Sequence, residues 1–380
     1  MTTVSAVLIV RNEALVLARC LAAVKDHVDE LIVADTGSTD NTVAVAQAMG
    51  AKVVHFAWID DFSAARNFAF AQATTDWSFW LDADDIAINP ERIRPLVANA
   101  PADVGGYQWR YINGRNNDGT PAFSYWRERC VRNDSGRRWQ GRIHEVMLID
   151  ERLRLVRSDE VSVEHQPPAG REKDPGRNLR ILEDEFNLAK GAPGARTLFY
   201  LGREYADNGQ TDKAIEILTR SGREDPWADQ RYLALTQVGA LQTSKGNYDE
   251  AIDVYLESLK THPTWPDAYF GLAQCYYYRQ DWPKVIHWIE IARSCPIPDT
   301  PLFRDERQLK IEWLIFYTNA LHHVGRAEAA REWTRLALKL DPKNQWHQAN
   351  AVFFAESPNL MPAPTEVGPC LSDDGQPGPC

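Results

Sequence analysis

The first 100 residues alternate continuous apolar runs with stretches in which apolar residues recur every three or four positions. The apolar runs predict strands at residues 4–10, 31–34, 53–56 and 77–81. The helical spacing between them predicts helices at residues 14–24, 42–49 and 62–73. Strands that alternate with helices indicate right-handed crossovers, so we expect an α/β, Rossmann-like fold with a mainly parallel sheet.

The pattern changes between residues 105 and 165. Tyr107, Trp109 and Tyr111 occupy alternate positions, a turn signal lies at 117–119, and alternation returns at 153–163. This region is therefore predicted to add antiparallel strands to the parallel sheet. A stretch containing Pro and Gly at 166–176 then predicts a linker.

A helical repeat follows the linker. Four small side chains at equivalent positions, Ala214, Ala251, Val285 and Ala330, are spaced 37, 34 and 45 residues apart. A period of about 34 residues fits the tetratricopeptide template, so an all-α solenoid of about four repeats is expected. The predicted organisation is an α/β domain, a linker helix, the repeats and a disordered tail rich in Pro and Gly, at residues 1–168, 169–194, 195–355 and 356–380.

Polar clusters follow three of the predicted strands directly, at residues 11–13, 35–40 and 82–85. In a parallel sheet these strand ends share one edge, where ligands bind. Asp82-Ala83-Asp84 is the one Asp-x-Asp in the chain. Carboxylates in this arrangement can bind Mg²⁺ or Mn²⁺ while phosphate oxygens and waters complete the shell. A solvated turn is the structural alternative.

The composition narrows the classes of function. The 380 residues include 42 Lys and Arg against 53 Asp and Glu, a net charge of −11. Nucleic acids and anionic membranes are bound mainly through basic side chains, so neither is expected as a partner. We also expect no transmembrane segment and no secretory signal. The six cysteines are dispersed without a Cys-x-x-Cys pair, which predicts a reduced, cytoplasmic protein.

Four blocks in order over residues 4–85 resemble the nucleotide-sugar-binding half of inverting GT-A glycosyltransferases of family 2. They read VSAVLIVRNEA, ELIVADTGSTDNT, DDFSAARNFAFAQATTDW and SFWLDADD. The resemblance implies that Asn12 and Glu13 lie against the uridine and that Asp35 contacts the uracil. It also implies that Arg66 reaches the diphosphate or the base edge, that Asp82 contacts the ribose or sugar, and that Asp84 binds the metal. From the residues alone, Asp35 can equally hold an Asx turn or cap a helix. Capping is the expected role of Ser38 and Asp40.

Inverting transfer requires a base that takes the acceptor proton. Residues 139–145, WQGRIHE, resemble the W-x-G-x-(I/V)-H-E signature of family-2 enzymes similar to lipopolysaccharide-core and peptide glycosyltransferases. On this resemblance Glu145 is the expected base and His144 the alternative. An ion pair with a nearby arginine is the structural alternative for Glu145. A late histidine can complete the metal shell in related enzymes, which implies that role for His165, with a capping or core position as the alternative.

Tryptophan is unusually frequent, with 13 residues. Ten are expected to pack in cores. The antiparallel region holds the other three, Trp109, Trp126 and Trp139, whose indole faces suit a sugar ring or a peptide. Trp139 is the first candidate. A run of arginines between residues 127 and 142 is expected to include one or two that clamp the diphosphate.

Together these features predict a metal-dependent inverting glycosyltransferase. It would move a hexose from a nucleotide sugar, UDP-linked by resemblance, to a peptide or protein side chain, as in the similar peptide glycosyltransferases of bacteriocin maturation. The repeats would present the acceptor or form a homodimer. Three alternatives are an enzyme acting on a glycan or glycolipid, a repeat scaffold with a degenerate catalytic domain, and a nucleotidyltransferase. The last is expected to carry a Gly-rich basic loop that the chain lacks after its first strand.

Overall fold

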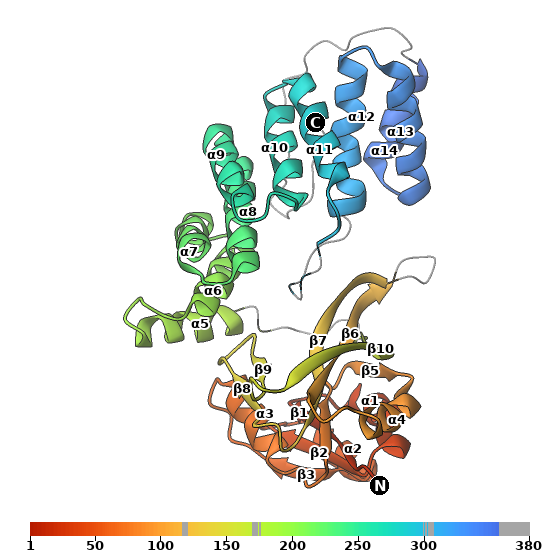
Figure 1. Ribbon diagram of the computed structural model, residues 1–380, viewed down its shortest axis with the longest axis vertical. Coiled ribbons are helices and arrows are strands. Elements are labelled where there is room, and N and C mark those ends of the chain that lie inside the picture. Colours follow the sequence, from red (N-terminus) through yellow and green to blue (C-terminus); the bar gives the residue numbers. More distant parts are fainter. Residues whose placement is uncertain are drawn as a thin grey trace. The chain divides into compact units, whose positions relative to one another are not determined.

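The computed structural model describes residues 1–115, 121–168, 174, 176–298, 300, 302 and 308–356. It divides into two compact units, Met1–Gly191 and Ala192–Cys380 (Figure 1). The expected order, an α/β part followed by a stack of paired helices, is confirmed. In the part of the chain that is described, no helix is both long and apolar enough to cross a membrane.

The first unit is built on an eight-stranded sheet with the order β3-β2-β1-β4-β7-β6-β10-β5. Its parallel half comprises β1 (Val4–Val10), β2 (Glu30–Asp35), β3 (Lys52–His55) and β4 (Trp77–Trp80). The helices of this unit are α1 (Leu17–Val24), α2 (Thr42–Ala48), α3 (Phe62–Phe70), α4 (Ile93–Ala98) and α5 (Arg177–Leu188). Single 3₁₀ turns lie at Lys25–His27 and Pro90–Arg92.

Helices cover both faces of the parallel half, which explains why its strands read as continuous apolar runs. Leu8 and Val33 share one core with α1, α2 and α4. The neighbouring residues Val7 and Ile32 point to the other face, where they pack with α3. Because β1 to β4 pair in parallel, the four strands end at one edge of the sheet, as the sequence predicts.

The second half of the sheet corrects the expectation that only antiparallel strands are added. β6 (Val104–Arg115) and β7 (Pro121–Arg132) form the expected antiparallel pair, but β10 (Arg154–His165) runs parallel to β6. Before β10 the chain passes through a separate two-stranded sheet of β8 (Arg138–Gln140) and β9 (Val146–Leu148). That long connection lets β10 lie on the far side of β6, whereas a tight hairpin would pair it with β7.

A further strand, β5 (Asp85–Ile88), begins at the last aspartate of the Asp82–Asp85 cluster, where the sequence predicts only a polar strand end. β5 pairs antiparallel with β10, and this pairing places Asp85 opposite His165. The side chains that follow β4 are thereby brought beside the end of a strand from much later in the chain.

The second unit contains nine helices within the described ranges. Eight form consecutive antiparallel pairs, namely α6 (Ala195–Asp207) with α7 (Thr211–Glu224), α8 (Ala228–Ser244) with α9 (Tyr248–Leu259), α10 (Asp267–Tyr278) with α11 (Trp282–Ser294), and α12 (Trp313–His323) with α13 (Ala327–Leu340). A π-helical turn at Gln308–Glu312 precedes α12, and α14 (Gln345–Glu356) adds one more helix. The predicted tail lies outside the described residues from 357 onward.

Two glycines permit the close packing of these helices. A Cβ atom on Gly271 of α10 would lie 2.2 Å from the ring of Tyr255 on α9, and one on Gly239 of α8 would lie 2.6 Å from the same ring. The Tyr255 ring therefore fits between its neighbours only because both positions lack a side chain. This contact is part of the core that joins the second and third repeats.

Candidate functional site

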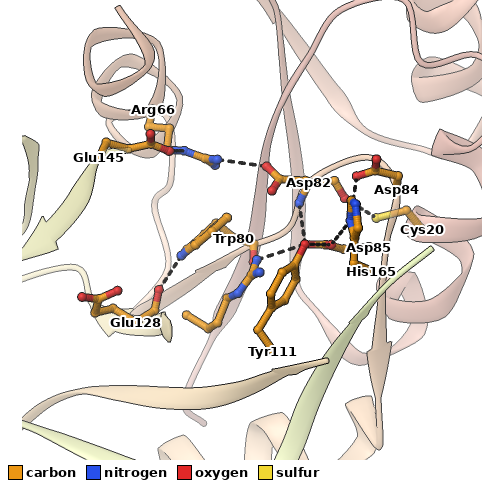
Figure 2. A network of polar contacts seen from close by, with 11 residues as sticks. Cys20, Arg66, Trp80, Asp82, Asp84, Asp85, Tyr111, Glu128, Glu145 and His165 are labelled. Carbon is orange, nitrogen blue, oxygen red and sulfur yellow. Dashed lines mark hydrogen bonds and ion pairs between the residues drawn. The ribbon is translucent and has the colours of Figure 1, made fainter. Parts of the chain in front are cut away.

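The loop from β4 to β5 carries three carboxylates at the edge of the sheet, those of Asp82, Asp84 and Asp85 (Figure 2). The loop is tightly turned. The amide of Asp85 donates to the carbonyl of Asp82 at 3.0 Å, and the amide of Asp82 donates back to Asp85 Oδ2 at 3.0 Å. Asp84 and Asp85 are buried, and Asp82 is partly exposed.

Asp85 is fully buried and ion-paired with Arg129, whose Nη1 lies 3.1 Å from Oδ2. The hydroxyl of Tyr111 donates to Oδ1 at 3.0 Å. Arg129 itself is enclosed by two rings, 3.6 Å from the Trp80 centroid and 4.5 Å from the Tyr111 centroid. The buried negative charge of Asp85 is thereby compensated by a cation that is held in the core.

His165 faces these carboxylates from the end of β10. Its Nδ1 lies 3.6 Å from Asp84 Oδ1 and 3.5 Å from Asp85 Oδ1. This contact with Asp85, together with the charge of Asp84, raises the pKa of His165 above its ordinary value although burial opposes the shift.

Asp84, Asp85 and His165 can each direct one ligand atom to a common point, with all three atoms within 4.8 Å of one another. His165 Nδ1 is buried, and the described residues offer it no hydrogen-bond acceptor in suitable geometry. A buried ring nitrogen beside two carboxylates fits a divalent cation. The structure thus brings together the two expected ligands and adds Asp85, whose one sequence signal is its position directly after the Asp-x-Asp.

A second charged cluster lies beside the first. Arg66 of α3 is buried, with Nε 2.6 Å from Glu145 Oε1 and Nη2 2.9 Å from Asp82 Oδ1. Its guanidinium lies over the rings of Trp80 and Trp139, at 4.2 and 5.0 Å. Arg66 thus joins the Asp-x-Asp loop to the segment that connects β8 and β9, and it forms the ion pair that was the structural alternative for Glu145.

The carboxyl groups in this cluster are held in their charged forms. Burial by itself would raise the pKa of Glu145, but the charge of Arg66, reinforced by Arg127, outweighs burial and lowers it. The same balance of burial against Arg66, with further help from Arg129, lowers the pKa of Asp82. His144, the other candidate base, is half-buried beside Glu145 and has a left-handed backbone with φ of 51°.

The residues expected to meet the nucleotide base hold two loops together. Asn12 follows β1. Its side-chain Oδ1 accepts from the backbone amide of Thr39 at 2.7 Å, and its backbone amide donates to Ser38 Oγ at 2.9 Å. Asp35, at the end of β2, accepts from the amides of Gly37 and Ser38 at 3.2 and 3.1 Å. The turn role of Asp35 is therefore present in the structure, whereas Ser38 contacts Asn12.

Two further residues fix the same loops. Glu13 is buried, and its amide donates to Thr42 Oγ1 at 2.7 Å. Asp40 accepts from the amide of Thr42, the first residue of α2, at 2.9 Å, and from the amide of Ala14 at 3.2 Å. Asp40 therefore makes a turn bond to the first residue of α2, whereas the N-cap position of that helix is Asn41. The two contacts of Asp40 connect the start of α2 to the end of β1.

The expected tryptophan platforms need correction. Trp109 is fully buried and Trp139 is 4% exposed, so neither indole offers a face to a substrate. Trp139 packs edge-on against Trp80 and against Phe70 of α3. Its indole is part of the core, with the guanidinium of Arg66 over the ring. The sequence around Trp139 does not show whether the side chain is buried or exposed. Trp126 of β7 alone among the three is partly exposed.

The arginine run separates into structural and site residues. Three arginines make hydrogen bonds elsewhere. Arg132 donates to Val104 O, Arg137 to Asn133 Oδ1 and Arg142 to Asp184 Oδ2. Arg138 is exposed on β8. Arg127 and Arg129 reach the site, where both lie against Trp80. Arg127 and Arg129 are therefore the two members of this run that lie beside the site.

Two family models match parts of this chain. A family model described as glycosyl transferase family 2 matches residues 5–171, and one described as TPR repeat matches residues 239–278. A TPR repeat-containing protein from Synechococcus elongatus is 34% identical over 287 residues, covering 68% of this chain and 66% of that protein. The SPbeta prophage-derived glycosyltransferase SunS from Bacillus subtilis is 27% identical over 276 residues, covering 68% and 63%. The chain thus spans about two thirds of the length of these relatives.

Among solved structures, the first unit is similar to glucosyl-3-phosphoglycerate synthase from Mycobacterium tuberculosis, solved in complex with Mn²⁺, uridine-diphosphate-glucose and phosphoglyceric acid. The identity is 26%, the match covers 30% of this chain and 45% of that one, and the TM-score is 0.25.

Proposed function

Residues 5–171 belong to glycosyl transferase family 2, and on that premise we propose that the protein is a metal-dependent inverting glycosyltransferase. It would transfer a hexose from a nucleotide sugar, UDP-linked by resemblance to its family, to a side chain of a peptide or protein. The observation that carries the proposal is the group formed by Asp84, Asp85 and His165 at the edge of the sheet. Arg66 and Asp82 lie directly beside it.

The metal-holding residues would act on the donor diphosphate. Asp84 and His165, with Asp85 next to them, fit Mn²⁺ better than Mg²⁺, because an imidazole nitrogen is a softer ligand than oxygen. A bound divalent cation would supply positive charge to the diphosphate oxygens as the nucleotide leaves. Arg127 adds a further positive charge on this side of the site, since its field lowers the pKa of both Glu145 and Asp82.

Glu145 would receive the proton of the attacking acceptor group. Arg66 keeps this carboxylate ionised at neutral pH, because its charge more than offsets the effect of burial on the pKa. The same arginine donates to Asp82, the residue proposed to contact the ribose or sugar. Arg66 is therefore placed to fix the base and the sugar-contacting carboxylate relative to one another, which in-line displacement requires.

The nucleotide would lie against the ends of β1 and β2. Asn12, Glu13 and Asp35 are proposed to form this wall, and the bonds among their loops hold it in place before any ligand arrives. The repeats of the second unit are proposed to bind the acceptor. Stacked helical repeats present extended surfaces that suit peptides, and the resemblance to peptide glycosyltransferases favours that acceptor class.

A donor panel tests the proposal. Full-length protein should slowly hydrolyse at least one UDP-sugar when supplied with Mn²⁺, and the Asp84→Ala variant should neither bind nor hydrolyse that donor. The active donor is then offered with peptides encoded beside the gene and, separately, with glycan and glycolipid extracts, and the products are weighed by mass spectrometry. The absence of turnover of every sugar nucleotide with every metal would sink the enzyme assignment. Transfer to lipid or glycan alone would replace the peptide acceptor.

A further inference from the structure

The carboxylate of Asp85 is largely engaged by hydrogen bonds inside the protein. Its Oδ2 accepts from Arg129 Nη1 at 3.1 Å and from the amide of Asp82 at 3.0 Å. Its Oδ1 accepts from the Tyr111 hydroxyl at 3.0 Å. A carboxylate has about four lone-pair positions, so these three bonds occupy most of them.

We propose that Asp85 is a positioning residue rather than a metal ligand, and that Asp85, Arg129 and Tyr111 together brace the Asp-x-Asp loop while Asp84 and His165 hold the cation. The inference deepens the proposed function and rests on it for the identity of the site. It divides the three residues that could meet at one cation into a bracing residue and two ligands.

The charge of the group supports this division. Arg129 and Asp85 are both buried almost completely, with side-chain exposures of 1% and 0%. A carboxylate whose charge is already matched by a buried guanidinium attracts a second cation weakly. Asp84 is also buried, and its Oδ1 lies 3.6 Å from His165 Nδ1, the buried ring nitrogen described above.

The anchorage of the group shows what it would do instead. Arg129 comes from β7 and Tyr111 from β6, and the arginine is enclosed between the Trp80 and Tyr111 rings. Asp85 connects these two strands to the loop through the amide of Asp82. The loop that carries Asp82 and Asp84 is therefore fixed to the interior of the sheet on its buried side, as Figure 2 shows for Asp85 and Tyr111.

The division of roles can be tested without any sugar nucleotide, by titrating Mn²⁺ alone into the full-length protein. Binding is measured as the loss of the electron paramagnetic resonance signal of free Mn²⁺. Asp84→Asn should weaken Mn²⁺ binding by more than about 100-fold, because a ligand is lost. Asp85→Asn should weaken it by only about tenfold, the size of effect that follows loss of a supporting contact. Tyr111→Phe, which removes one bond to Asp85, should have a smaller effect in the same direction.

A double variant guards against misfolding and separates the two roles. Asp85→Asn alone leaves the Arg129 charge buried without its partner, whereas Asp85→Asn with Arg129→Gln replaces the ion pair by a neutral hydrogen-bonded pair. If Asp85 braces the loop, the double variant should recover most of the Mn²⁺ affinity lost by the single one. Equal losses in Asp84→Asn and Asp85→Asn, with no recovery in the double variant, would overturn the inference, as would wild-type protein that binds no Mn²⁺. Mn²⁺ binding with the expected pattern but no turnover of any donor would instead refute only the proposed function.

Discussion

Arg66 and Glu145 form a buried ion pair, with 2.6 Å between Nε and Oε1, although 79 residues separate them in the chain. The pair connects helix α3 to the segment between β8 and β9. Stability and activity should therefore both depend on it, in ways that different substitutions can separate.

Replacing Arg66 by methionine should destabilise the first unit by about 3–5 kcal/mol, because Glu145 would be left as a buried charge without its cation. Urea denaturation followed by circular dichroism measures the change. Arg154→Met is the matched control, since Arg154 pairs with Asp103 on the exposed surface. That variant should leave the free energy of unfolding nearly unchanged, and equal losses in the two variants would contradict the importance of the buried pair.

Glu145→Gln should lower the rate of glycosyl transfer by about 10²–10⁴-fold, the usual contribution of a general base. Gln keeps the size of the side chain and an oxygen that can accept from Arg66, but it cannot take up the acceptor proton. UDP affinity, measured by isothermal titration calorimetry, should stay within a few-fold of wild type. Retained transfer would move the base elsewhere, with His144→Ala the next variant to make.

The stability that Glu145 contributes should depend on pH in a defined direction. The pKa of Glu145 in the folded protein lies below its ordinary value of 4.5. Its ionised form therefore stabilises the fold above the ordinary value, and this stabilisation is lost as the pH falls through the folded pKa. The difference in unfolding free energy between wild type and Glu145→Gln should be constant from about pH 5 to pH 7 and should shrink below about pH 4. A difference that grows on acidification would contradict the shift.

The different burial of Trp139 and Trp126 predicts different losses of stability when each is replaced by alanine. Trp139→Ala should cost about 3–5 kcal/mol of unfolding free energy, because the indole fills the core against Trp80 and Phe70. Trp126→Ala should cost less than about 1 kcal/mol, since Trp126 is partly exposed. If a tryptophan contacts the acceptor, the Michaelis constant for the acceptor should rise only in the Trp126 variant. A stable Trp139→Ala protein with weakened acceptor binding would restore the original expectation.

Removal of divalent metal should abolish donor hydrolysis, and Mn²⁺ should restore it more effectively than Mg²⁺. The reason is the imidazole of His165 in the group with Asp84, because nitrogen ligands favour Mn²⁺ over the harder Mg²⁺. The assay compares hydrolysis after treatment with a chelator and re-addition of each metal. In His165→Ala the preference for Mn²⁺ should diminish. Full activity in the presence of the chelator would show that the carboxylates serve another purpose.

Several features of the site could be predicted from local sequence. The four parallel strands are covered on both faces, so each reads as a continuous apolar run, and their shared edge follows from the alternation of strands and helices. A shared metal role for Asp84 and His165 could be expected only through the resemblance to family-2 glycosyltransferases, which implies that role for both residues. The structure places them together, with Nδ1 and Oδ1 3.6 Å apart.

Other features depend on long-range contacts that local sequence does not encode. β5 is only four residues long, and its strand conformation comes from pairing with β10. Glu145 reads equally well as a base or as an ion-pair partner, because the chain gives no local sign that Arg66 lies beside it. The position of Trp139 is ambiguous in the sequence for a similar reason, since an indole suits a core and a sugar-binding surface alike, and only its packing against Trp80 decides between them.

The insertion of β10 between β6 and β5 has a practical consequence for anyone expressing part of this chain. A fragment cut before residue 150 would contain every block that resembles the donor-binding half, including the Asp-x-Asp. It would lack the strand that pairs with β5 and the imidazole that faces Asp84, and β6 would lose one of its two partners. In such a fragment β6 would become an exposed edge strand, which favours aggregation. The shortest useful fragment of the first unit therefore extends past His165, well beyond the last of the motifs by which the donor-binding half can be recognised.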